Sequence, residues 1–197
     1  MLTLKAFIKS LFISTIIGLV GTGLFIYSGL YPIGADVPHN KLTYWILETL
    51  RERSIARSVS GIQIPDNLHT SSRLLVGGAD YNYMCAGCHL VPNKKESDFT
   101  IGLYPSPPNL TATADDHGHK HGGVPGMNED ENNTAIKRQF WIIKHGIKAS
   151  GMPAWGPTHS DERIWNMVAF LQRLPTLSED QYQILTSRGN ATEKHDH

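Results

Sequence analysis

A long apolar run near the amino terminus dominates the hydrophobic pattern of this chain. After Lys9, the segment SLFISTIIGLVGTGLFIYSGLYPIGA continues to Ala35 without a charged residue. About 20 apolar residues span a bilayer core as a helix, so we expect an uncleaved transmembrane anchor over residues 10–32. The alternative is a cleaved signal peptide, whose apolar region would be about 7–15 residues long. The run exceeds that length, and LYPIGADVP is a poor cleavage site.

The residues that flank this run predict its orientation. Lys5 and Lys9 precede it, and Tyr27 and Tyr31 lie near its far end. Basic residues favour the cytoplasmic side, and tyrosines favour the membrane interface. We therefore expect residues 1–9 in the cytoplasm and the rest of the chain exported. In a Gram-negative cell this means a single-pass inner-membrane protein whose main domain lies on the periplasmic side.

The connector over residues 33–70 contains one predicted amphipathic helix, for which Asn40 suits the N-cap position. One face of this helix collects four apolar residues, Leu42, Trp45, Ile46 and Leu50. Three arginines follow, Arg51, Arg53 and Arg57. Two interpretations stay open: the helix packs on the main domain, or it lies at the membrane surface.

Residues 71–176 have the pattern of a helical domain. A helix is predicted from about Ser72 into the segment YNYMCAGCHLVP, and an irregular stretch rich in Pro, Gly, Asn and Asp follows up to about Asn133. The next segment, TAIKRQFWIIKHGI, is amphipathic, with Ile136, Phe140 and Ile143 facing inward.

The last predicted helices follow the loop KASGMPAWGPTH. SDERIWNMVAFLQRL should form a helix that is capped by Ser160 and ends near Pro175. Within residues 177–197, Ser178 and Gln181 suit a capping box for a short helix, and the tail RGNATEKHDH should be disordered. No strand-like alternation of any length appears, so the predicted fold class is all-α.

Composition narrows the function without naming it. The formal net charge is zero with histidines neutral, and no basic stripe or arm is visible, so we expect no nucleic-acid partner. Both cysteines of the chain, Cys85 and Cys88, lie in the pentapeptide CAGCH, which ends at His89. We weigh three readings of this motif: a redox dithiol, half of a zinc site, and a haem attachment site.

The context favours haem attachment. A zinc site commonly needs a second pair of ligands, which only His117, His119 and His121 could supply, from a polar loop. A thioredoxin-type dithiol belongs to a βαβ context, and strands are missing here. Cys-x-x-Cys-His is the attachment pattern of c-type haem, in which each thiol forms a thioether to a haem vinyl group. His89 would then be the proximal ligand of the iron.

A low-spin haem carrier needs a sixth ligand, and methionine can supply it. Met84 abuts the attachment motif, Met167 lies inside a predicted core helix, and Met127 lies in a polar stretch. Met152 is the best candidate because it lies in a loop framed by Gly151 and Pro153, between two helices.

With these residues in view, the chain resembles a class I cytochrome c of the membrane-anchored, single-haem type found in proteobacteria. The similarity covers about residues 75–176 and is carried by GLYPSPPNLT, FWIIKHGIK, GMPAWGPTHSDERIW and MVAFLQRLP. It implies the class I cytochrome c fold around one covalent haem c per chain.

The resemblance also implies roles for individual residues. Gly77 and Tyr81 would cross the C-terminal helix at its own aromatic residue, Phe170. The Pro108 carbonyl would accept a hydrogen bond from His89, and Met152 would be the distal ligand of the iron. Leu110 and Trp155 would line the haem pocket.

The expected function is electron transfer without substrate turnover, between redox donor and acceptor proteins of a membrane respiratory chain. An alternative is a haem enzyme or gas sensor with an open distal position, for which His145 or His159 would act on protons. A third possibility is metal handling by His117, His119 and His121, although a solvated loop with incidental histidines is the preferred reading there. The tail histidines, His195 and His197, are read in the same way.

Overall fold

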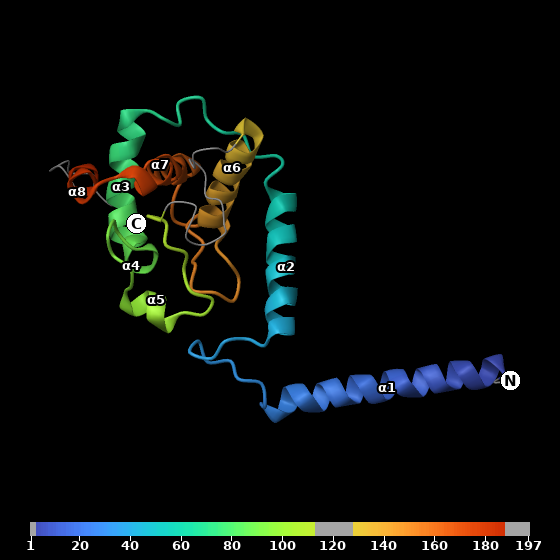
Figure 1. The fold of residues 1–197 in the computed structure, drawn as a ribbon. Helices are drawn as coiled ribbons and strands as arrows, with labels where there is room; N and C mark the ends of the chain where they lie inside the picture. The colour runs from blue at the N-terminus through green and yellow to red at the C-terminus, as the bar shows by residue number, and fades with distance from the viewer. Residues whose placement is uncertain (1–2, 113–127, 188–197) are drawn as a thin grey trace. The chain divides into compact units, whose positions relative to one another are not determined.

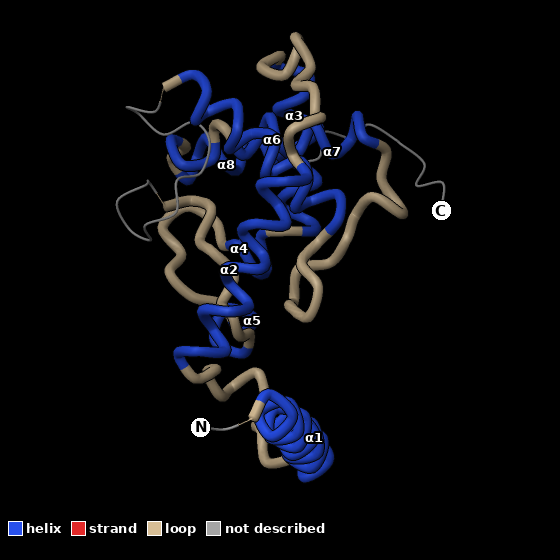
Figure 2. The backbone as a smooth tube through the Cα atoms, turned by 90° about the vertical axis from the view of Figure 1, so that its right-hand side faces the viewer, coloured by secondary structure: helices blue, strands red, loops and turns tan. Residues whose placement is uncertain are grey.

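The computed structural model describes residues 3–112 and 128–187 (Figure 1). Within these ranges it contains helices and no strands, as Figure 2 shows, and the predicted all-α class is therefore confirmed for the described residues. By its internal contacts the chain divides into two compact units, Met1–Val37 and Pro38–His197.

The first unit is built on helix α1 (Leu4–Ser28). The side chain of Thr3 caps its start, and Gly29 ends it in a left-handed conformation with φ of 65°. None of its residues is buried, and it is long and apolar enough to cross a membrane. A signal sequence near the amino terminus has the same properties, so the helix fits both readings of the apolar run.

The second unit is organised by the crossing of α3 (Ser71–Met84) and α7 (Asp161–Leu171). At the crossing, a Cβ atom on Gly77 would lie 1.9 Å from the carbonyl oxygen of Asn166, so no larger residue fits without separating the helices. Next to it, the rings of Tyr81 and Phe170 pack at a centroid distance of 5.4 Å. Gly77, Tyr81 and Phe170 thus meet at the crossing, as the resemblance implied.

The apolar core lies around this crossing. The 3-10 turn η1 (Leu174–Thr176) and helix α8 (Glu179–Thr186) follow α7, and α8 packs against α3. The predicted capping box of Ser178 and Gln181 is present. Most of the fully buried large side chains come from α3, α7 and the segments that flank them, and three other segments of this unit supply the rest: Leu68, Tyr81, Ile164, Met167, Val168, Phe170 and Leu174, with Ile55, Leu90 and Ile136.

Helix α6 (Glu129–His145) starts earlier than the sequence pattern indicated, at Glu129 within the stretch expected to be irregular. The reason is capping: the Asn128 side chain accepts a hydrogen bond from the amide of Glu131, and three acidic residues in the first turn suit the positive end of the helix dipole. Ile136, Phe140 and Ile143 are buried as predicted. The same stretch also contains the short helix α5 (Asp98–Gly102), which the sequence pattern did not predict.

Helix α2 (Lys41–Ser58) begins at the predicted cap, Asn40, and contacts α6. The contact is made by its C-terminal half, where Ile55 is buried and Glu52 pairs with Arg138 at 2.6 Å. The four apolar residues that the pattern placed on one face are all exposed: Leu42, Trp45, Ile46 and Leu50. The interpretation in which the helix packs on the domain is confirmed by the contact with α6, but this contact does not bury those four side chains.

Candidate cofactor-binding site

The two thiols and His89 lie on one helical turn directly after α3. Cys85 ends α3, and α4 (Ala86–His89) follows without a gap. The amides of Cys88 and His89 both donate to the carbonyl of Cys85, at 3.1 and 2.8 Å. Both thiols are free, and burial, reinforced by the charge of Asp80, raises the pKa of Cys85 to about 12. Cys85 is therefore a neutral thiol at physiological pH.

The segment after Pro107 holds His89 at two points. The Nδ1 atom of His89 lies 2.9 Å from the carbonyl oxygen of Pro108, and the amide of Leu110 donates to the carbonyl of His89 at 3.2 Å. Because a carbonyl oxygen can only accept, Nδ1 carries the proton and Nε2 keeps a lone pair. The hydrogen bond expected between His89 and Pro108 is thus present, and it leaves Nε2 able to bind a metal.

The charge state of His89 agrees with that role. Burial lowers its pKa, and the hydrogen bond to Pro108 offsets part of this effect. The imidazole is therefore neutral near pH 7, which is the form that binds iron.

A second support for His89 was not foreseen from the sequence. The hydroxyl of Tyr81 donates to the carbonyls of His89 and Leu90, at 3.1 and 2.7 Å. Leu90 is buried and has φ of 71° and ψ of 175°, a conformation that residues other than glycine rarely adopt. Tyr81 thus fixes the backbone turn that ends α4. The only signal in the sequence was a tyrosine, rather than a phenylalanine, at the helix crossing.

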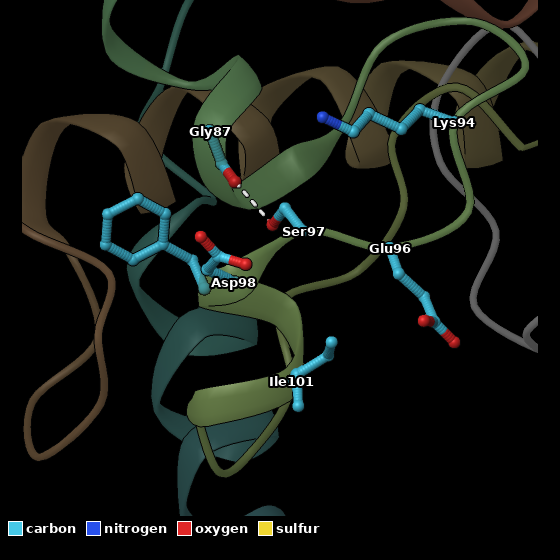
Figure 3. A pocket seen from close by; sticks show the side chains of 7 residues that line it. Gly87, Lys94, Glu96, Ser97, Asp98 and Ile101 are labelled. Atoms are coloured by element: carbon cyan, nitrogen blue, oxygen red, sulfur yellow. Dashed lines mark hydrogen bonds between the residues drawn. The ribbon is translucent and has the colours of Figure 1, made fainter.

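A shallow hollow of about 380 Å³ lies beside the attachment turn (Figure 3). Ser97 donates to the carbonyl of Gly87 at 2.7 Å, and this bond ties α5 to α4. A Cβ atom on Gly87 would contact the ring of Phe99 at 3.6 Å. None of the residues predicted to bind the cofactor lines this hollow. The contribution of α5 to the site is the bond from Ser97, which holds α4 in place.

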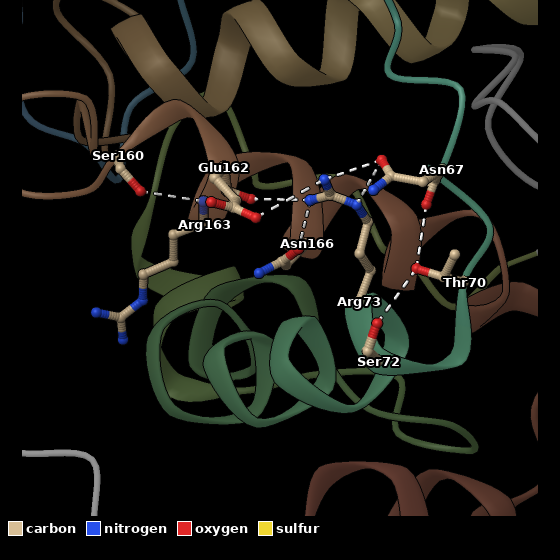
Figure 4. Close-up of polar contacts among 8 residues, drawn as sticks. All are labelled: Asn67, Thr70, Ser72, Arg73, Ser160, Glu162, Arg163 and Asn166. Carbon is tan, nitrogen blue, oxygen red and sulfur yellow. Dashed lines mark hydrogen bonds and ion pairs between the residues drawn. The ribbon is translucent and has the colours of Figure 1, made fainter.

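Hydrogen bonds and an ion pair fix α3 against α7. Figure 4 shows Arg73 reaching Asn67 and Asn166, with distances of 3.0 and 2.7 Å. Further along α3, the buried carboxylate of Asp80 accepts two bonds from Arg163, at 2.7 and 2.8 Å. These contacts set the rotation of α3, and hence the direction in which α4 presents its side chains.

Met152 lies in the loop between α6 and α7, which is hydrogen-bonded to the end of α6. Its carbonyl accepts from the amide of Ile147 at 3.1 Å, and its amide donates to the hydroxyl of Ser150 at 3.1 Å. The loop turns at Gly146, where φ is 65° and a Cβ atom would lie 2.8 Å from the carbonyl oxygen of Met152. The backbone of Met152 is therefore held in place, while its side chain is half-buried against the core.

Trp155 is held by the same helix end. Its amide donates to the carbonyl of Ile143 at 3.0 Å, and its ring makes an edge contact with His159 at a centroid distance of 5.2 Å. The pKa of His159 is lowered, mainly by burial. The other histidine considered for proton chemistry, His145, is exposed at the end of α6.

The residues present fit a covalently bound haem c. The two thiols are unpaired, and the imidazole beside them is neutral with a lone pair on Nε2. Partly buried apolar side chains border the core on four segments that are separate in the sequence: Met84 and Cys85, Val91, Leu110, and Met152 with Trp155. Thiols, an imidazole, a thioether and an apolar border form the donor set and setting that haem c requires.

Several predicted residues do not enter this arrangement. Met167 is buried in the core under Gly77, as expected. His117, His119, His121, Met127, His195 and His197 lie outside the described residues. Within the described ranges, no group of three or more His, Cys, Asp or Glu side chains could hold a metal ion.

Comparison with known proteins identifies one related family. The family model described as cytochrome C oxidase, cbb3-type, subunit III, matches residues 73–171, half of the chain. No curated protein and no solved structure matches this chain. The matched region begins in α3 and ends with α7, so it contains the attachment turn, Pro108, Leu110 and the Met152 loop.

Proposed function

The chain belongs to the family of c-type cytochrome domains described as cytochrome C oxidase, cbb3-type, subunit III, and on that premise we propose that it is a membrane-anchored electron carrier with one haem c. The class I cytochrome c domain supports a role in haem-based electron transfer. The finer proposal is that Cys85 and Cys88 would attach the haem and that His89 and Met152 would hold its iron. Haem c, when bound, supplies an iron that takes up and releases one electron.

The observation that carries this proposal is the fixed His89 ring. Pro108 holds the proton on Nδ1, and Tyr81 and Leu110 hold the backbone of the same residue. Such a partner fixes the ring orientation and makes the ligating nitrogen more basic. A ligand fixed in this way needs little rearrangement when the charge on the metal changes, which suits electron transfer.

Met152 would complete the ligands of the iron and leave no coordination position for a substrate. Ordering a flexible loop costs about 1–2 kcal/mol per residue, but the Met152 loop is already tied to α6 through Ile147 and Trp155. A thioether ligand raises the potential of a haem relative to a second imidazole. Leu110 and Trp155, on the apolar border, would exclude water.

The proposed location is the periplasmic side of the inner membrane. Its support is α1, together with Lys5 and Lys9 before the apolar run. An anchor confines the haem domain near the bilayer and raises its effective concentration at membrane-bound redox donors and acceptors.

The proposal is tested on the haem-loaded full chain. Met152→Ala should remove the weak absorbance at the red end of the oxidised spectrum that marks sulfur on ferric iron, lower the potential, and let carbon monoxide bind. Met127→Ala, the matched control, should leave all three unchanged. Replacing both Cys85 and Cys88 by Ala should abolish haem that survives a denaturing gel.

The outcomes separate the parts of the proposal. If Met152→Ala keeps the red-end band, Met152 is not the ligand. If the unaltered chain already binds carbon monoxide rapidly, the distal position is open, and the reading as a pure carrier is wrong. If haem stays attached after both cysteines are replaced, the attachment site itself is wrong.

A further inference from the structure

Helix α2 presents an apolar stripe to solvent. Leu42, Ile46 and Leu50 follow one another at intervals of four residues, so they lie on one side of the helix. Their exposed fractions are 64, 49 and 66%, and Trp45 beside them is 62% exposed. Two apolar side chains on other sides of this half of the helix are also exposed, Tyr44 at 43% and Leu47 at 47%. Exposed apolar side chains gathered on one surface segment mark an interaction site.

The stripe is not the face by which α2 holds to its own domain. That face contains Glu52, which pairs with Arg138 of α6, and Ile55, which is 2% exposed. With about 100° of rotation per residue, Ile55 lies opposite Ile46 and Glu52 lies about 120° from it. Trp45, seven residues before Glu52, lies on the side of Glu52 and not on the stripe. The stripe is therefore free to meet another surface while α2 stays packed on α6.

The same side of the helix becomes basic toward its C-terminal end. Arg53 lies three residues after Leu50, and Arg57 four residues further, so both continue the stripe. Both are exposed, and among the described residues neither forms an ion pair. Arg51, on another side of the helix, pairs with Glu48 and Glu52. The stripe thus joins apolar side chains to two positive charges that no acidic side chain of the described residues pairs with.

Chain connectivity limits how far this stripe can lie from the end of α1. Helix α1 ends at Ser28 and α2 begins at Lys41, so residues 29–40 join them. Twelve residues span at most about 43 Å when fully extended. A membrane that holds α1 is therefore always within reach of α2. The connector lies outside the family match at residues 73–171.

We propose that the stripe of Leu42, Ile46, Leu50, Arg53 and Arg57 lies on the bilayer surface and binds anionic phospholipid. The three aliphatic side chains enter the interfacial region, where burial of apolar area favours binding. Arg53 and Arg57 meet phosphate groups, which attract juxtamembrane basic residues. The inference rests on the proposed anchor, and it makes the connector a fixed support that holds the haem domain at the membrane surface.

The test measures thiol reactivity in the full-length, haem-loaded chain with one chain per lipid nanodisc. The variants are Ile46→Cys on the stripe, Ser58→Cys at an exposed position off the stripe, and Leu19→Cys in α1. A charged, water-soluble maleimide is added, and mass spectrometry reports the labelled position. In nanodiscs of phosphatidylcholine and phosphatidylglycerol, Ile46→Cys should react at least about tenfold more slowly than Ser58→Cys, because the reactive thiolate is disfavoured in an apolar setting.

The arms distinguish the failure of this inference from failure of the anchor. Equal rates at Ile46→Cys and Ser58→Cys, with Leu19→Cys protected, overturn the stripe and leave the anchor standing. Rapid labelling of Leu19→Cys overturns the anchor. Protection of Ile46→Cys that is unchanged in pure phosphatidylcholine overturns the role of the arginines. Protection found in native membranes but not in nanodiscs shows that a protein covers the stripe instead, and overturns the inference.

Discussion

Replacing Tyr81 by Phe removes one oxygen atom from the support of His89. The ring of Tyr81 is 1% exposed and packs against Phe170, so phenylalanine fits the same space. The lost hydroxyl serves two carbonyls, those of His89 and Leu90. The carbonyl of His89 keeps its bond from the Leu110 amide, whereas that of Leu90 accepts no other bond among the described residues.

The cost follows from that difference. A buried carbonyl left without a donor costs about 1–3 kcal/mol. The backbone of Leu90, with φ of 71°, holds about 1–3 kcal/mol of strain that its surroundings must maintain. We therefore expect Tyr81→Phe to lower the free energy of unfolding by about 2 kcal/mol. The matched control is Tyr182→Phe, whose hydroxyl donates to the exposed Asn82 and can be replaced by water, at a cost of about 0.5 kcal/mol.

Both variants are unfolded in guanidinium as haem-loaded full chains in mild detergent, with near- and far-ultraviolet circular dichroism as probes. Tyr81→Phe should lower the midpoint at unchanged slope. Amide exchange at Leu110 should also accelerate, because its bond to His89 opens more often. If Tyr81→Phe is no less stable than Tyr182→Phe, or if Leu110 exchange is unchanged, the hydroxyl does not position His89.

Two further predictions concern the helix crossing. Gly77→Ala should lower the free energy of unfolding by about 3 kcal/mol or more, since its Cβ atom would lie 1.9 Å from the backbone oxygen of Asn166. The control, Gly102→Ala, has open space around it and should cost little in the same denaturation assay. Equal costs for the two variants would contradict the close helix crossing. Burial raises the pKa of Tyr182 to about 12, above its ordinary value near 10. The stability that the neutral phenol contributes is therefore present below pH 10 and is lost as the pH rises toward 12. Tyr182→Phe should make this decline of stability with pH shallower, and an unchanged decline would refute the raised pKa of Tyr182.

The sequence predicted those features that depend on local pattern. Asn40, Ser160 and Ser178 cap helices where the pattern placed them, because an N-cap bond involves residues only three apart. The haem-attachment reading of CAGCH could be made from sequence, since both thiols and the imidazole lie on one turn. The start of α6 was missed because the cap at Asn128 stood in a stretch that looked polar and irregular. The partners of Tyr81 were missed because a hydroxyl gives no sign in sequence of which carbonyl it will meet.

The chain by itself determined the all-α class, the apolar anchor candidate and the thiol pair with its histidine, since composition and short spacing are enough for each. Only the tertiary structure decided that Gly77 meets the backbone of Asn166 and that Asp80 pairs with Arg163. It also showed that the apolar face of α2 is exposed while Ile55 packs inward. The physical reason is that periodicity shows which side chains share a face, but burial depends on what that face meets, and contacts between distant segments are fixed only when the helices pack.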